Sequence, residues 1–175
     1  MVDRRTALAG GALLLAGCGS STLRSKVKKG AKVTPSDVDI LNRLLEVEYY
    51  AIAAYTAGTP FLSHHDRDAA KQLVGQDVTH ASTLAGLIKQ GGGKAVSPQP
   101  SYDLGRPSAP EILALLHTLE GRQLDAYLAM IPLLSPGRLR STAAAIMAND
   151  AQHLAVLRVA LGRPPVPSPL ASGRE

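Results

Sequence analysis

The sequence predicts an all-α fold, a four-helix bundle of two antiparallel helical hairpins joined by a long crossover. Three observations predict it. The 175-residue chain is 45% hydrophobic with no Trp and a single Phe. Such a mainly aliphatic composition suits helix packing better than strands. After residue 33 there are four segments with helix start and stop signals. The two pairs of segments also resemble each other at a period of 72 to 73 residues, as a duplicated hairpin would.

The N-terminus is expected to be a targeting segment and not part of the bundle. Arg4-Arg5 precedes a short apolar run, Ala7 to Ala16, which cannot span a bilayer because that takes about 20 apolar residues. With Gly17-Cys18 it resembles a bacterial twin-arginine export signal ending in a lipobox. The resemblance implies removal of residues 1–17, a lipid on Cys18, and attachment to the outer face of the cytoplasmic membrane. The alternative is an ordinary cleavable signal with an incidental Cys.

Residues 18–33 are predicted to form a flexible basic tether, because they are small or basic and show no apolar periodicity. A basic patch beside one acyl anchor makes membrane attachment stable. The net charge of +5 owes much to this stretch. Nucleic acid is not an expected partner, since no aromatic residues are interleaved with the charges and export removes the protein from it. The single Cys excludes a disulfide within the chain.

The bundle is predicted over residues 34–162, with helices at 35–57, 64–90, 109–131 and 136–161. The first three begin at Thr34, Ser63 and Ser108, each followed three positions later by an acid that can reach back to free amides of the first turn. Ser135-Pro136 opens the fourth. The helix ends are marked by Gly or Pro at Gly58, Gly91, Pro132 and Gly162.

The connections set the topology. The links between the first two helices and between the last two are only a few residues long, so each pair must be antiparallel. Residues 91–108 are long enough to run the length of a bundle as a crossover, although a linker between subdomains would look alike. The Pro-rich tail, residues 163–175, is expected to be extended and solvated.

Six polar residues interrupt the apolar stripes of the four helices at equivalent points of the repeat. Glu48 corresponds to Glu120, and the pair Asp77 and His80 corresponds to Asp150 and His153. Residues at i, i+3, i+4 and i+7 share a helix face, so all six are expected to point inward. A charged outer face instead fits the residues Arg43, Glu46, Lys71, Lys89, Arg140 and Arg158.

Four inward carboxylates need compensation, because an isolated buried charge costs several kcal/mol or more. No Lys or Arg shares those stripes. Two divalent cations would balance four negative charges, with two neutral imidazoles completing the ligands. Oxygen and nitrogen ligands of this kind suit iron, manganese or zinc. The alternative is a set of protonated acids hydrogen-bonded to the two His and to Tyr55 and Tyr127, which lie seven residues after Glu48 and Glu120.

This ligand pattern resembles the ferritin-like di-metal carboxylate proteins, in which two helices give one Glu each and two give Glu-x-x-His. Over residues 35–161 the chain is similar to the exported ferritin-like domain family, which implies that the six residues hold two metal ions, iron first, with manganese or zinc as alternatives. Asp77 and Asp150 stand where the family has Glu, and each loses about 1.5 Å of reach. The site could therefore bind metal more weakly, hold one ion, or survive as a relic.

The resemblance implies an oxidoreductase that oxidises Fe(II) with dioxygen or peroxide, or a di-manganese centre that dismutates peroxide. Tyr55 and Tyr127 are its candidate catalytic residues, as hydrogen-bond partners or redox relays. The alternative is a non-catalytic lipoprotein that binds metal or a partner. The expected partners are metal ions, dioxygen or peroxide, and the membrane, with a homodimer as one option for assembly. His117 is expected to be a hydrogen-bonded core residue and not a ligand, and His64 and His65 to be solvated.

Overall fold

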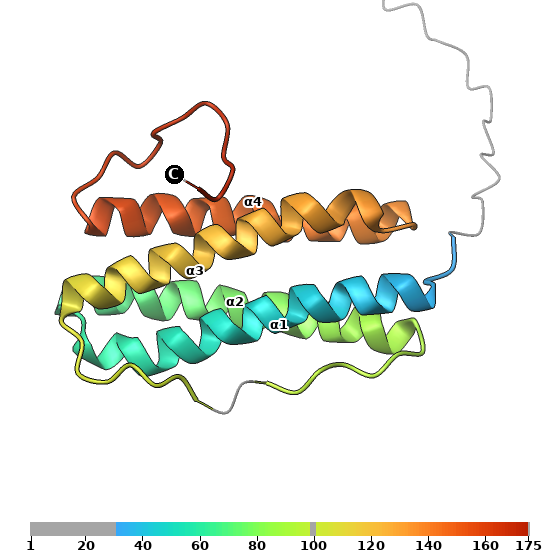
Figure 1. Ribbon diagram of the computed structural model, residues 1–175, viewed down its shortest axis with the longest axis horizontal. Helices are drawn as coiled ribbons and strands as arrows, with labels where there is room; N and C mark the ends of the chain where they lie inside the picture. Colours follow the sequence, from blue (N-terminus) through green and yellow to red (C-terminus); the bar gives the residue numbers. More distant parts are fainter. Residues whose placement is uncertain (1–30, 99–100, 175) are drawn as a thin grey trace, which may run out of the picture.

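The computed structural model describes residues 31–98 and 101–174, and these form a four-helix bundle (Figure 1). The helices are α1 (Pro35–Gly58), α2 (His64–Gln90), α3 (Ala109–Met130) and α4 (Gly137–Ala160). The short 3-10 turns η1 (Thr59–Phe61) and η2 (Ile131–Leu133) continue α1 and α3. The main packing is between α1 and α2, between α3 and α4, and between α1 and α3. Two antiparallel hairpins therefore lie side by side, which confirms the predicted fold class.

The predicted helix ends agree with the structure to within one residue. The capping residues act as expected at Ser63, whose Oγ accepts a hydrogen bond from the Asp66 amide at 3.2 Å, and at Ser108, whose amide donates to Glu111 at 2.7 Å. The fourth helix differs. Pro136 precedes α4 and is not its first residue, because its backbone is extended (φ −73°, ψ 132°) and its carbonyl accepts from the Leu139 amide at 3.0 Å.

Asp37 ties the start of α1 to the start of α4. Its carboxylate is fully buried and accepts hydrogen bonds from the Thr34 amide at 2.8 Å and from the Ser135 amide at 2.7 Å. Burial alone would raise the pKa of Asp37, but the hydrogen bonds from Ser135 and Thr34 outweigh it and lower the pKa. One side chain therefore both caps the first helix and fixes the loop that begins the fourth.

Replacing Asp37 with Ala is expected to lower the free energy of unfolding by about 2 kcal/mol, because the part-buried amides of Thr34 and Ser135 lose their acceptor. Urea unfolding at pH 7 measures this. Asp39→Ala, an exposed acid in the same turn, is the matched control and should change little. Since the folded pKa is lowered, the contribution of Asp37 exists above pH about 4 and should vanish as the pH falls below it.

The segment between the hairpins is a crossover along α1. The Asn42 side chain, on α1, donates to the Lys94 carbonyl at 3.1 Å and accepts from the Val96 amide at 2.9 Å. Farther along, the ring of Tyr102 meets that of Tyr50 edge-on, with centroids 5.6 Å apart. Figure 1 shows this segment running the length of the bundle, so the crossover interpretation is confirmed and the subdomain linker is not.

The core has two apolar clusters. One contains Leu44, Leu84 and Ile88 together with residues from the beginning of α4, and the other contains Leu73, Ile112 and residues from the ends of α1 and α4. All of these side chains are buried. The six predicted inward polar residues fall between the two clusters along each helix, so a polar layer is enclosed by aliphatic packing on both sides.

The tail differs from its prediction. It is largely exposed, but it leaves α4 at Gly162 (φ +68°), arches away, and returns over the middle of α4 (Figure 1). Gly173 meets Gly121 of α3 so closely that a Cβ on either residue would collide with the backbone of the other. This return covers Arg158, which is only 8% exposed. The prediction that Arg158 lies on the outer face was therefore wrong, because the tail buries it.

The expected signal segment, Cys18 and most of the tether lie outside the described residues. Within residues 31–98 and 101–174, no helix has both the length and the hydropathy needed to cross a bilayer.

Candidate metal centre

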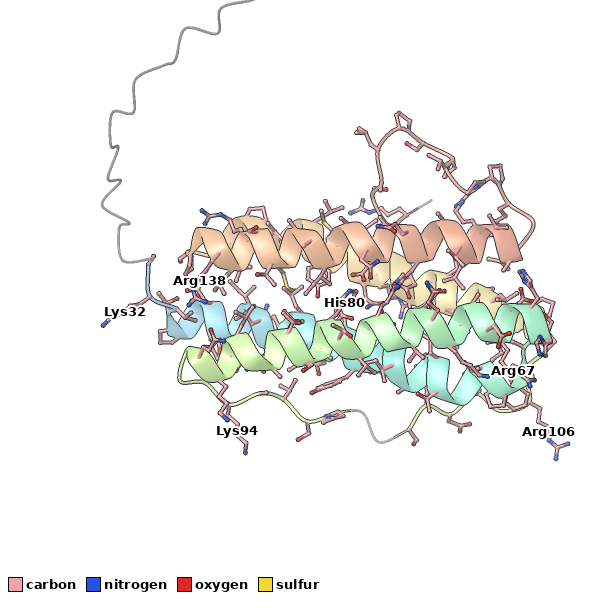
Figure 2. All side chains as sticks on the ribbon, turned by 180° about the vertical axis from the view of Figure 1, so that it is seen from behind. Lys32, Arg67, His80, Lys94, Arg106 and Arg138 are labelled. Atoms are coloured by element: carbon pink, nitrogen blue, oxygen red, sulfur yellow. The ribbon has the colours of Figure 1, made fainter. Side chains whose placement is uncertain are left out.

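The polar layer brings together all six predicted metal ligands. Glu48 comes from α1, Asp77 and His80 from α2, Glu120 from α3, and Asp150 and His153 from α4. The four carboxylates are fully buried, and the two His are 8% and 1% exposed. Figure 2 shows His80 in the interior midway along the bundle, whereas Lys94 and Arg106 project away from it. His64 and His65 are solvated as expected, with side chains 93% and 94% exposed.

The six residues form two groups of ligand atoms. Asp77, Glu120, Asp150 and His153 offer one set, and Glu48, His80 and Asp150 offer the other, with the atoms of each set within 4.8 Å of one another. Ligand atoms about 2.0 to 2.2 Å from an ion lie at most about 4.4 Å apart, so each set needs little contraction to bind one. Asp150 belongs to both groups and Asp77 to only one. Asp150 is thus the carboxylate common to both groups, although Asp77 Oδ1 also lies 3.8 Å from His80 Nδ1.

Each imidazole faces its own ligand group through its Nδ1 atom. His80 Nδ1 lies 3.2 Å from Asp150 and 3.6 Å from Glu48, and His153 Nδ1 lies 3.2 Å from Glu120 and 3.4 Å from Asp77. The two rings are nearly parallel, with centroids 6.1 Å apart. This near-symmetry is what the sequence repeat requires.

Several buried polar atoms of this layer have no hydrogen-bond partner within the described residues. They are both carboxylate oxygens of Asp77 and of Asp150, Glu120 Oε2, and His80 Nδ1. None of the four carboxylates forms an ion pair with Lys or Arg in that part of the chain. Buried polar atoms are normally paired, so a cluster of unpaired ligand atoms from four helices fits bound cations well.

Each Tyr of the repeat hydrogen-bonds the Glu of the other hairpin. The Tyr55 hydroxyl donates to Glu120 Oε1 at 2.7 Å, and the Tyr127 hydroxyl donates to Glu48 Oε1 at 2.6 Å. Both Tyr are fully buried, one in each apolar cluster. These bonds orient the Glu carboxylates and link the hairpins through the centre. The sequence predicted the four residues but not this crossed pairing.

Two glutamines next to the ligands were missed by the sequence reasoning. Gln123 Nε2 donates to Glu48 Oε2 at 3.0 Å, and His153 Nε2 lies 2.7 Å from Gln76 Oε1, so that His153 Nε2 is the donor. Partners of this kind fix ring orientation and ligand basicity. A signal was available: Gln123 is one turn after Glu120, and Gln76 immediately precedes Asp77. Their counterparts in the repeat, Ala51 and Asn149, differ, so the repeat did not reveal them.

The family model for the ferritin-like domain matches residues 36–163. The chain belongs to this ferritin-like family. Among solved structures, the ferritin-like bundle is similar to a conserved hypothetical protein, rv2844, from Mycobacterium tuberculosis. The identity is 18% and the TM-score 0.68, over 77% of this chain and 96% of that one, so this likeness shows the fold. No curated protein matches the chain.

His117 lies on α3 with 9% of its surface exposed, and it belongs to neither group of ligand atoms.

Without bound metal the ferritin-like centre retains protons. Burial and then the charge of Glu120 raise the pKa of Asp77 to about 9. Burial also raises the pKa of Glu48 and of Glu120. At His80 burial lowers the pKa, but the carboxylates of Asp150 and Glu48, 3.2 and 3.6 Å from Nδ1, outweigh it and raise the pKa to about 10. For His153 burial dominates and lowers the pKa.

Metal binding is therefore expected to release at least the protons of Asp77 and His80 near pH 7, because both must leave before those atoms can bind a cation. The apparent affinity should rise with pH until the pH passes the two pKa values, about 9 and 10. Calorimetric titration with Mn²⁺ in buffers of different ionisation enthalpy counts the released protons. Binding without proton release between pH 6 and 8 would contradict this assignment.

Proposed function

We propose that this protein is a di-metal oxidoreductase that oxidises Fe(II) at the expense of peroxide or dioxygen and so limits iron-driven oxidative damage. The observation that carries the proposal is the pair of ligand groups sharing Asp150, with unpaired carboxylate and imidazole atoms in a buried layer. Two adjacent cation sites can handle two electrons together, which matches the two-electron reduction of peroxide.

The reaction balances over two iron ions. Two Fe(II) substrates become two Fe(III), and the two electrons with two protons convert one peroxide into two water molecules, or one dioxygen into peroxide. Glu48, His80 and Asp150 would hold one ion, and Asp77, Glu120, Asp150 and His153 the other. Hard oxygen and imidazole ligands suit iron and manganese, and zinc could occupy the same set without redox chemistry.

The residues around the ligands have separate tasks. The Tyr55 and Tyr127 hydroxyls hold Glu120 and Glu48 by donated hydrogen bonds. Burial raises the pKa of both Tyr well above its ordinary value, and the charges of Glu120 and Glu48 raise it further, so both phenols remain protonated donors. The aliphatic clusters on either side exclude water. In this proposal Tyr55 and Tyr127 are also the nearest side chains that could relay an electron.

The test combines metal analysis with turnover. Protein purified from its native host should contain up to two ions per chain, and added Fe(II) should be oxidised faster than in buffer, with oxygen or peroxide consumed in proportion. Tyr55→Phe and Tyr127→Phe should keep the metal content and slow the oxidation if the Tyr act in turnover. A protein that contains no metal and does not speed Fe(II) oxidation by dioxygen or by peroxide would rule out the proposed enzyme activity.

A second candidate is a ferritin-like protein that binds metal without turnover. The observation that favours it is the position of Asp77, which belongs to only one ligand group. With Asp in place of the longer Glu, one of two bridges could be missing. Such a protein would bind metal in the same analysis but leave Fe(II) oxidation at the rate of buffer.

We also propose that the protein is exported and lipid-anchored, on the strength of Arg4-Arg5 and the run that ends at Cys18. Cys18→Ser should move the protein from the membrane fraction to the soluble fraction of the same cells. Mass spectrometry should find diacylglycerol on Cys18 of the wild type. An unmodified, soluble wild-type chain would overturn the anchor without affecting the metal centre.

A further inference from the structure

We propose that the space between α3, α4 and the returning tail binds a small organic monocarboxylate with an apolar body. This site is separate from the metal centre. Three observations carry the proposal: a partly open, mainly apolar cavity, a buried guanidinium that lines it, and a tail that is held at both ends over it.

The cavity has a volume of about 250 Å³. One face of α4 lines it with Ala151, Leu154, Ala155 and Arg158, which follow the i, i+3, i+4, i+7 spacing. The opposite wall is the tail, residues 165–171. Its large apolar residues, Val166 and Leu170, border the cavity but remain mostly exposed, so the tail covers the cavity only in part. Apart from Arg158 and His117, the lining is aliphatic or Pro with one Ser. The cavity is therefore suited to an apolar body and has charge at one place.

Arg158 provides that charge. It is only 8% exposed, and its Nε donates to the Pro164 carbonyl at 2.7 Å. Its Nη1 is buried and has no hydrogen-bond partner within the described residues, where no carboxylate forms an ion pair with it either. A guanidinium is always protonated and carries five donors, so a buried unpaired one calls for an anion.

The tail is built to remain over the cavity. At its start it turns at Gly162 and is held by Arg158. At its end Gly173 packs on Gly121, and Arg174 pairs with Asp125 of α3 at 3.1 Å. Between these two points the chain arches over α4 (Figure 1). An arch held at both ends can cover a ligand, which can enter because the cavity is already partly open to solvent.

The chemistry selects the ligand class. One guanidinium, with a lining that is otherwise mainly aliphatic apart from His117 and Ser168, matches one carboxylate with a hydrocarbon body, because a phosphate carries more charge and needs more donors. An apolar cavity of roughly 150 Å³ holds benzene. The larger cavity here, about 250 Å³, has room for a carboxylic acid of roughly eight carbons. Octanoate is therefore the probe of choice.

The test is calorimetric titration of octanoate into the full chain carrying Cys18→Ser, which needs no detergent to compete for the cavity. We expect one octanoate per chain, with 1-octanol and octylamine at least about tenfold weaker because neither satisfies Arg158. Equal affinity for the three compounds would overturn the proposal. So would displacement of octanoate by inorganic phosphate, because the site would then recognise any anion.

Three variants locate the site. Arg158→Met keeps the apolar stem and should weaken octanoate at least about tenfold while leaving 1-octanol unchanged. Arg163→Met, the same change at an exposed tail residue outside the cavity, is the matched control and should bind octanoate normally. Ala155→Leu should fill the cavity and weaken both octanoate and 1-octanol. Helicity and thermal melting without ligand check the fold of each variant.

The outcomes are distinct. Octanoate that binds Arg158→Met or Ala155→Leu as tightly as the wild type would be bound elsewhere, including at the metal centre, and the proposal would fail. Loss of affinity in Arg163→Met as large as in Arg158→Met would show a nonspecific effect of tail charge and would overturn it as well. If Arg158→Met does not fold, Ala155→Leu alone decides the location.

Discussion

Replacement of Asp150 by Ala is expected to remove one of the two metal ions, whereas the same replacement at Asp77 should leave both. The two residues are counterparts in the repeat and are equally buried, but only Asp150 contributes to both ligand groups. Without Asp150 the second group retains only Glu48 and His80. The first group still has Asp77, Glu120 and His153, which can hold one ion. Without Asp77 both groups keep three protein ligands.

Metal per chain, measured after dialysis against a fixed concentration of Mn²⁺, should fall to about one in Asp150→Ala and stay near two in Asp77→Ala. Fe(II) oxidation should fall by more than about 100-fold in Asp150→Ala, since even losing a residue beside a ligand costs 10- to 100-fold. Asn149→Ala, next to Asp150 but not a ligand, is the control. Equal metal loss in the two Asp variants would mean that both residues bridge, or that neither does.

The helices of this protein could be predicted from sequence because their signals are local. Capping residues such as Thr34 and Ser108 act within one turn, and Gly or Pro ends each helix without help from distant segments. The inward position of the six polar residues followed from helical periodicity for the same reason. Their convergence followed from the repeat, which places equivalent residues at the same level of two packed hairpins.

What the sequence could not predict depends on distant contacts. Arg158 has the spacing of an outer-face residue and is buried only because the tail returns over α4. The crossed bonds of Tyr55 and Tyr127 depend on how the hairpins pack. The unequal roles of Asp77 and Asp150 follow from distances between side chains on different helices, which a repeat in the sequence represents as equal.

Metal loading is expected to stabilise the bundle strongly. A ligand that binds only the folded state at 1,000 times its Kd adds about 4 kcal/mol to the free energy of unfolding. Removal of the metal with a chelator should lower the free energy of unfolding, because at pH 7 folded Asp77 must hold a proton that the unfolded chain would release. With pKa values of about 9 folded and about 3.9 unfolded, the cost at pH 7 is also about 4 kcal/mol.

The sign of the pH dependence follows from proton counting. Between pH 4 and 9 folded Asp77 binds a proton that the unfolded chain lacks, and between about 6.5 and 10 the same holds for His80. Stability falls with pH wherever the folded state binds more protons. The chelated protein should therefore lose stability from pH 5 to pH 9, while the stabilisation added by Mn²⁺ should grow over the same range.

Urea unfolding at several pH values, with chelator and with Mn²⁺, measures both trends. The matched control replaces the four carboxylates by amides, Glu48→Gln, Asp77→Asn, Glu120→Gln and Asp150→Asn, which keeps the side-chain shapes and leaves acceptors for the Tyr55 and Tyr127 hydroxyls. This variant should ignore metal, lose most of the pH dependence, and exceed the chelated wild type in stability above pH 7, since removal of uncompensated buried charge is often stabilising. A wild type equally stable with and without metal would mean that protons alone balance the buried carboxylates.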